Sequence, residues 1–192
     1  MNYPRKKILL LALLFEGGLL IVALVLAAFL RLDLLHGNNN VMKGVLYGTA
    51  LAIPPFGLFL LSLSKRAERI PFIGSLKKLV IHDIRHFFAQ SRVTDLIFIS
   101  LMAGIGEEAL FRGVIQQQFG IVAASIVFGL AHCISPAYVI VTVLMGLYIG
   151  FIYQATQSLL VPVQLHFVYD LAALLYLRYA IDPASKLMED DQ

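Results

Sequence analysis

Long apolar segments constrain the fold of this chain more than any other feature of its sequence. The first, ILLLALLFEGGLLIVALVLAAFL over residues 8–30, contains a single charged residue, Glu16. About 20 consecutive apolar residues suffice for a helix to cross the hydrocarbon core of a bilayer. The whole chain is 59% hydrophobic and 14% charged, whereas ordinary soluble domains are about 25% charged. We therefore expect an integral membrane protein.

The apolar segments predict an all-α fold, a polytopic transmembrane bundle of about six helices. The alternation of apolar and polar residues that a membrane barrel requires is absent. No linker rich in Gly, Ser or Pro divides residues 1–192, so we expect one integral membrane domain. The expected spans are residues 8–30, 44–64, 93–115, 119–134, 137–155 and 158–179.

Lys and Arg predict how the bundle is oriented, because they collect in cytoplasmic loops. Six spans place both termini on one side. That side carries twelve of the fifteen Lys and Arg, against Arg31 and Lys43 opposite and Arg112 within the membrane. We expect both termini to be cytoplasmic, in a plasma membrane of bacterial type.

The link between the second and third spans predicts an interfacial helix. In PFIGSLKKLVIHDIRHFFAQ, Leu76, Val80, Ile84 and Phe87 recur at helical spacing, with most charged residues elsewhere. This pattern is typical of an amphipathic helix on an anionic membrane surface.

Two further residues are interpreted as packing residues. Glu16 must face the bundle or water rather than lipid, and we interpret it as a buried packing carboxyl. Cys133 follows His132 directly, and neighbours on a helix point about 100° apart. We therefore expect Cys133 to be a small buried apolar residue, not a nucleophile.

Four charged residues within predicted spans mark a functional site. A charge at mid-membrane costs about 2.5 to 3.5 kcal/mol on insertion scales, so Glu107, Glu108, Arg112 and Asp170 together require on the order of 10 kcal/mol. Glu108 and Arg112 are four residues apart and can form a charge-assisted pair. Glu107 has no such local partner, which makes it the better general base.

Two histidine pairs complete the set. Phe128 and His132 are four residues apart, as are His166 and Asp170, so each pair shares a helix face. An isolated FxxxH pattern is weak, because a lone membrane histidine is more often a helix-to-helix hydrogen bond. A carboxylate base with two imidazoles is suited to peptide hydrolysis, in which a base activates water and nearby groups stabilise the oxyanion. The HExxH and GxSxG motifs are absent.

The motifs EEALFR, FGLAH and HFVYD, beginning at Glu107, Phe128 and His166, resemble the EExxxR, FxxxH and HxxxN/D motifs of the CPBP family. These are the CAAX-processing and bacteriocin-immunity (Abi) intramembrane proteases, related to the type II CAAX prenyl endopeptidase. Their order and membrane context make a specific signature within a catalytic core of about residues 93–180. The first two spans carry no motif.

The resemblance implies a role for each matching residue. Glu107 and His132 would hold and activate the attacking water, with Glu108, Arg112 and Phe128 as structural support. His166 and Asp170 would stabilise the oxyanion and position the peptide.

Prenyl proteases carry asparagine where this chain has Asp170. Because an ionised carboxylate cannot donate a hydrogen bond, Asp170 must be protonated, orient His166, or help to bind a metal.

The requirement for a metal is left open by the sequence. Zinc is possible, with His132, His166, Asp170 and Glu107 as candidate ligands. We favour a mechanism with no cofactor, because these ligands lie on separate helices.

The expected function is an intramembrane endopeptidase that cuts a membrane-associated peptide or protein. The alternatives are a non-catalytic interaction or immunity protein and a proton-coupled transporter. Membrane lipid and the substrate are the expected partners, and nucleic acid is not. The sequence does not indicate the substrate, the cleavage site or the oligomeric state.

Overall fold

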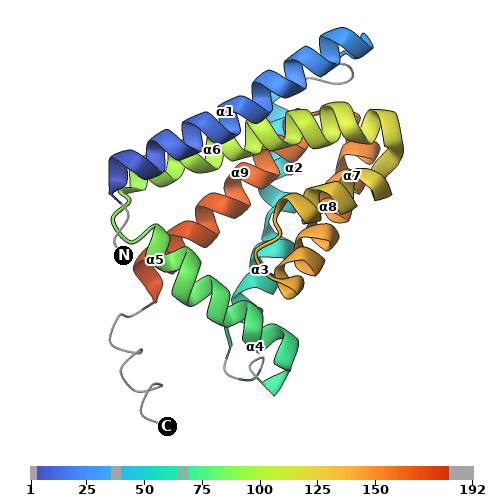
Figure 1. Ribbon diagram of the computed structural model, residues 1–192. Helices are drawn as coiled ribbons and strands as arrows, with labels where there is room; N and C mark the ends of the chain where they lie inside the picture. Colours follow the sequence, from blue (N-terminus) through green and yellow to red (C-terminus); the bar gives the residue numbers. More distant parts are fainter. Residues whose placement is uncertain (1–3, 36–39, 65, 67–68, 182–192) are drawn as a thin grey trace, which may run out of the picture.

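The computed structural model describes residues 4–35, 40–64, 66 and 69–181, and within them all regular structure is helical (Figure 1). Three π-helical segments, Leu79–Ile84, Phe111–Gln116 and Tyr176–Ala180, extend these helices. Five continuous helical segments are long and apolar enough to cross a membrane. The all-α membrane fold is thus confirmed. The α-helices are α1 (Arg5–Leu30), α2 (Val41–Leu51), α3 (Ile53–Ser62), α4 (Pro71–Lys78), α5 (Arg85–Phe87), α6 (Val93–Leu110), α7 (Gln117–Ala131), α8 (Pro136–Thr156) and α9 (Leu160–Leu175).

The expected fourth span, residues 119–134, is wrong as an independent crossing. It belongs to the long segment Val93–Ala131, which breaks at Gly120, where φ is 82° and ψ is 169°. Glycine adopts positive φ without steric cost, and the chain turns back between α6 and α7 (Figure 1). From Ile121 to Ala131 the helix extends only about 16 Å, which is half of the hydrocarbon core.

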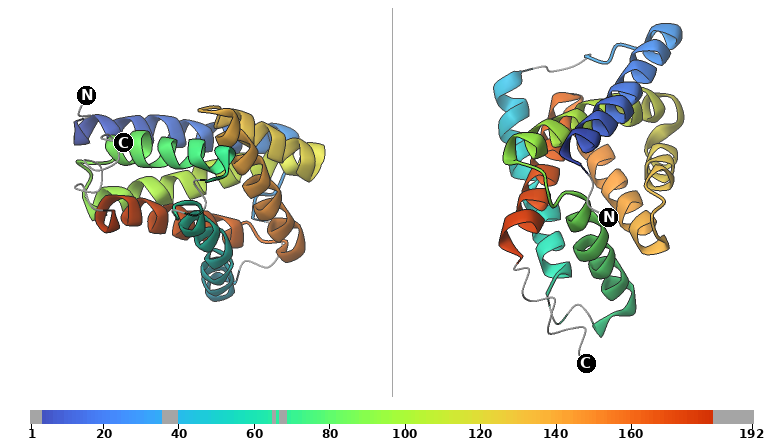
Figure 2. Two further views of the ribbon diagram at one scale, coloured as in Figure 1. Left: turned by 90° about the horizontal axis from the view of Figure 1, so that it is seen from below. Right: turned by 60° about the vertical axis from the view of Figure 1, so that its left-hand side comes forward.

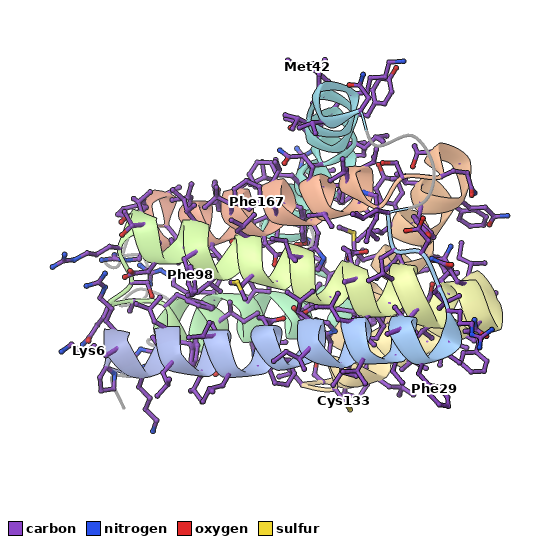
Figure 3. The ribbon with its side chains drawn as sticks, turned by 90° about the horizontal axis from the view of Figure 1, so that it is seen from above. Lys6, Phe29, Met42, Phe98, Cys133 and Phe167 are labelled. Atoms are coloured by element: carbon purple, nitrogen blue, oxygen red, sulfur yellow. The ribbon has the colours of Figure 1, made fainter. Side chains whose placement is uncertain are left out.

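Helices α1 and α6 lie side by side and run in the same direction (Figure 3). An ion pair joins Arg5 to Asp95 near their first residues. Further along, Gly106 lies against the Glu16 backbone, where an added Cβ would come within 2.5 Å of the Glu16 carbonyl oxygen. The absence of a side chain at Gly106 therefore allows close contact between the two helices.

The beginnings of α1 and α6 and the end of the α9 segment lie at the same end of the molecule (Figure 1). There the Arg85 guanidinium donates hydrogen bonds to the carbonyls of Leu177 and Ile181. These segments belong to the side predicted to be cytoplasmic. Lys65 and Lys186 of that prediction lie outside the described residues, and the orientation in the membrane stays a prediction.

The predicted amphipathic link is helical from Pro71 to Phe87, and its apolar face is packed on the protein. Leu76 and Val80 are buried together with Leu177, at the end of the α9 segment. The sequence predicted that this face would rest on the membrane surface. In the structure the end of the α9 segment covers Leu76 and Val80 instead. The link thus forms one wall of the bundle (Figure 2).

Helices α7 and α8 form a closely packed antiparallel pair joined by residues 132–135. Ser135 caps α8 by accepting a hydrogen bond from the Tyr138 amide, and Pro136 occupies the first turn, where a missing N–H costs nothing. Cys133, in the connection, is exposed. The expectation that it would be buried is wrong, because α7 ends before it.

Candidate active site

The predicted site residues come from three helical segments that meet inside the bundle. Glu107 and Glu108 lie on α6, and Glu107 is about 20 Å along the helix from Val93. His132 directly follows the last residue of α7, and α9 carries His166 and Asp170, one turn apart. Because α7 stops halfway, His132 is brought to the depth of Glu107.

Glu108 and Arg112 form the buried pair that their spacing predicts. The Arg112 Nε lies 3.2 Å from Glu108 Oε2, and its Nη2 donates to the Gly146 carbonyl at 3.0 Å. The guanidinium also lies over the Phe128 ring, 4.7 Å from its centroid. With both charged side chains at most 1% exposed, these contacts hold α6, α7 and α8 together around the site.

His166 has a carboxylate oxygen beside each ring nitrogen. Its Nδ1 lies 2.6 Å from Glu108 Oε1, and its Nε2 lies 3.3 Å from Asp170 Oδ2. Because Glu108 is paired with Arg112 and acts as an acceptor, the hydrogen of Nδ1 points towards it. This contact orients the imidazole so that Nε2 faces Asp170 and, at 4.0 Å, Glu107 Oε2.

His132 is oriented in a different way. Its Nδ1 lies 2.8 Å from the Phe128 carbonyl oxygen, which can only accept, so Nδ1 carries a hydrogen. In the neutral ring Nε2 is then an acceptor. Nε2 lies 3.6 Å from Glu107 Oε2, and the Phe128 ring packs against the imidazole with a centroid distance of 4.6 Å.

Glu107 has a carboxylate oxygen without a close donor. It is 6% exposed, and its Oε2 has no hydrogen-bond partner among the described residues. The separation of 3.6 Å from His132 Nε2 is too long for a hydrogen bond between them. Two acceptors at this spacing can both receive hydrogen bonds from one water molecule.

A cavity of about 450 Å³ lies in front of Glu107 and Asp170. Residues that the motifs did not indicate also line it, including Glu16 of α1, Asp83 of the link, and the tyrosines Tyr138 and Tyr169. The sequence showed Glu16 only as a charge within a span. Its position beside the site depends on the contact between α1 and α6, which nothing in the sequence indicates except neighbouring glycines.

A second, apolar cavity of about 370 Å³ lies next to the first. The two cavities share Phe59, Val80, Tyr138 and Tyr169 as walls. The apolar cavity extends between α3, α4 and α8. It offers space for an apolar segment close to the carboxyl groups.

The four candidate metal ligands do not fit a zinc site in this arrangement. Zinc in a catalytic site is held by three protein ligands, and no group of three His, Cys, Asp or Glu among the described residues is placed to hold a metal ion. Both nitrogens of His166 face carboxylate oxygens rather than a shared centre. Glu107 Oε2 and His132 Nε2 are two acceptor atoms that lie 3.6 Å apart.

The segment that carries these residues is similar to a known protein family. The family model described as Type II CAAX prenyl endopeptidase Rce1-like matches residues 89–172. Residues 89–172 of this chain are therefore similar to the Rce1-like domain. The domain includes Glu107, His132, His166 and Asp170, whereas Glu16 and Asp83 lie before its first residue.

One curated protein is similar to part of this chain. The uncharacterized protein YpbD of Bacillus subtilis (strain 168) is 30% identical over 99 residues, which are 50% of this chain and 52% of YpbD. The match thus spans about half the length of that relative. No solved structure matches the chain significantly.

Proposed function

We propose that the protein is an intramembrane endopeptidase that hydrolyses a peptide bond in a membrane-associated protein or peptide. The observation that carries this proposal is the pair of acceptor atoms, Glu107 Oε2 and His132 Nε2, 3.6 Å apart, at the edge of a cavity of about 450 Å³ that Glu107 lines. The Rce1-like domain supports it.

The first step is attack by water on the scissile carbonyl carbon. The water donates one hydrogen bond to Glu107 and one to His132, and its oxygen forms the new C–O bond. One water proton passes to the Glu107 carboxylate, which acts as the general base. The carbonyl π electrons move to the oxygen and create the oxyanion.

The second step is breakdown of the tetrahedral intermediate. The C–N bond breaks, the proton on Glu107 passes to the departing amine, and a carboxylic acid remains on the other product. Glu107 is thereby returned to its starting state, so no additional reactant is needed. His132 holds the water through Nε2 because its Nδ1 is committed to the Phe128 carbonyl.

His166 is proposed to stabilise the oxyanion. Its Nε2 lies between Glu107 Oε2 and Asp170 Oδ2, at 4.0 and 3.3 Å, beside the attack site. Of the three roles considered for Asp170, this geometry favours orientation of His166. A hydrogen on Nε2 that Asp170 holds in the ground state is available to the oxyanion when it forms.

The experiment compares wild type with Glu107→Gln in lipid vesicles. Each protein is incubated with a library of membrane-tethered peptides, and new termini are identified by mass spectrometry. We expect wild type to produce new termini and Glu107→Gln to lose at least about 100-fold in rate, since the base contributes that much or more.

The matched control is Asp33→Asn, an acid-to-amide change in the α1–α2 connection that keeps the acceptor for the Leu35 amide. It should cleave like wild type. A non-catalytic immunity protein or a proton-coupled transporter would leave every peptide intact. Cleavage by Glu107→Gln at the wild-type rate would refute the assignment of the base.

A further inference from the structure

The cavity in front of Glu107 has an unusual charge balance. Four carboxyl side chains line it, and no Lys or Arg occurs among its described lining residues. Arg112 and the two imidazoles are the cationic groups in contact with the site, and Arg112 is engaged by Glu108 and the Gly146 carbonyl. The four carboxyl groups are Glu16, Asp83, Glu107 and Asp170.

This balance leaves negative charge without compensation. Together with Glu108 there are five carboxyl groups, of which Asp83 is exposed to solvent. Even with both imidazoles protonated, three cationic groups among the described residues face the other four carboxyl groups. Unpaired charge in a buried region is costly unless a partner arrives. The cavity is therefore complementary to a cation supplied from outside the protein.

Glu16 is the carboxyl group for which the catalytic steps give no role. Its Oε2 is buried and has no hydrogen-bond partner among the described residues. Its backbone is held against Gly106, the residue before Glu107, so it cannot move away from the site without separating α1 from α6. Glu107, which is 6% exposed, lines the same cavity, and its Oε2 also has no hydrogen-bond partner among the described residues.

We propose that Glu16 is a specificity-determining residue that receives a basic side chain, Lys or Arg, of the peptide substrate close to the scissile bond. This inference rests on the proposed endopeptidase function and names the class of its substrates. The apolar remainder of the lining, including Ile99, Ala103 and Leu174, suits the aliphatic stem of such a side chain.

Asp83 adds a second carboxyl group that favours a basic side chain, at the entrance of the cavity. It is exposed, lies on the link at the predicted cytoplasmic end, and borders the same cavity as Glu16. A cation approaching from that surface meets Asp83 first and Glu16 deeper inside. Carboxylates along such a path concentrate cations by their field.

The test uses membrane-tethered peptides that differ at one position beside the cleaved bond, which carries Lys or Gln. Wild type should cleave the Lys peptide with a kcat/KM about tenfold or more above that of the Gln peptide, as expected for a partly buried ion pair. Glu16→Gln should reduce kcat/KM for the Lys peptide about tenfold and leave the Gln peptide within about twofold of wild type.

Asp33→Asn, outside the cavity, is the control and should keep the full preference. Equal cleavage of both peptides by wild type would overturn the proposal. The proposal would also be overturned if Glu16→Gln kept the preference for the Lys peptide. The same holds if the preference is kept in Glu16→Gln and lost in Asp83→Asn. A loss of cleavage of both peptides by Glu16→Gln, in a protein of wild-type thermal stability, would assign Glu16 to catalysis and also overturn it.

A binding measurement separates this inference from the proposed function. The chain contains no Trp, so the emission of a Trp placed in the peptide reports binding alone. Wild type in vesicles should bind the Lys peptide about tenfold more tightly than the Gln peptide, and Glu16→Gln should bind the two equally. Absence of cleavage with this binding pattern would refute only the endopeptidase, whereas equal binding by wild type would refute the role of Glu16.

Discussion

The two imidazoles show how single residues acquire different roles from their surroundings. His132 has a backbone carbonyl at Nδ1 and an open Nε2, whereas His166 has a carboxylate at both nitrogens. The residue types and the i, i+4 pairs were predictable from the sequence, because helical geometry fixes them. The contact between His166 and Glu108 was not, because it joins residues 58 positions apart.

The Arg112 pair predicts a stability effect. Arg112→Lys keeps the charge but cannot contact Glu108 and the Gly146 carbonyl together. A buried acceptor left unsatisfied costs about 1 to 3 kcal/mol, so the thermal midpoint in detergent should fall by several degrees. Arg31→Lys, the same change at an exposed residue, should leave it unchanged. An unaltered midpoint in Arg112→Lys would contradict the structural role.

The geometry of the candidate ligands predicts that cleavage is independent of a metal. Treatment with a strong zinc chelator should leave the rate of peptide cleavage unchanged, since in the proposed mechanism Glu107 and His132 activate water without a third ligand. The rate is measured before chelation, after it, and after zinc is added back. Loss of activity with recovery on adding zinc would contradict the metal-independent mechanism.

Among the helices, the break at Gly120 and the early end of α7 position His132 in the site. Long apolar runs predicted where most helices lie, because helix length follows bilayer thickness. The sequence did not reveal that α7 is a half-length helix, since its apolar composition resembles that of a full span. Gly120 marks the reversal, but the position of a glycine alone does not distinguish a break from close packing.

The α1–α6 contact predicts different effects for two glycines. An added Cβ at Gly106 would come within 2.5 Å of the Glu16 carbonyl oxygen, whereas one at Gly18 meets nothing within 4 Å. Gly106→Ala should therefore destabilise the protein by about 1 to 3 kcal/mol and lower the rate of peptide cleavage. Gly18→Ala should be neutral or slightly stabilising, since alanine favours helix. Equal midpoints and rates in the two variants would argue against the tight contact.

At the scale of the whole molecule, the parallel α1 and α6 and the opposed α9 bring the beginnings of α1 and α6 to the same end as the end of the α9 segment (Figure 1). The distribution of Lys and Arg predicted this grouping. Which end faces the cytoplasm follows from the positive-inside rule, not from the packing of helices.

Cysteine labelling tests this orientation. In a Cys133→Ser background, which removes the single native cysteine, cysteine is introduced by Lys7→Cys or Lys43→Cys, both at exposed positions. A membrane-impermeant maleimide added to intact cells should label only Lys43→Cys, and permeabilised cells should show labelling of both. The reverse pattern would invert the orientation.

In the proposed mechanism, Glu107 and His132 hold one water molecule between them. A double-variant cycle tests this by measuring kcat/KM for wild type, Glu107→Gln, His132→Gln and the double variant with one peptide. Residues that act as a unit are strongly non-additive. We predict that each single change lowers kcat/KM by at least about 100-fold and that the double variant is little worse than either. Two losses that multiply, or a single variant with wild-type kcat/KM, would contradict a shared water.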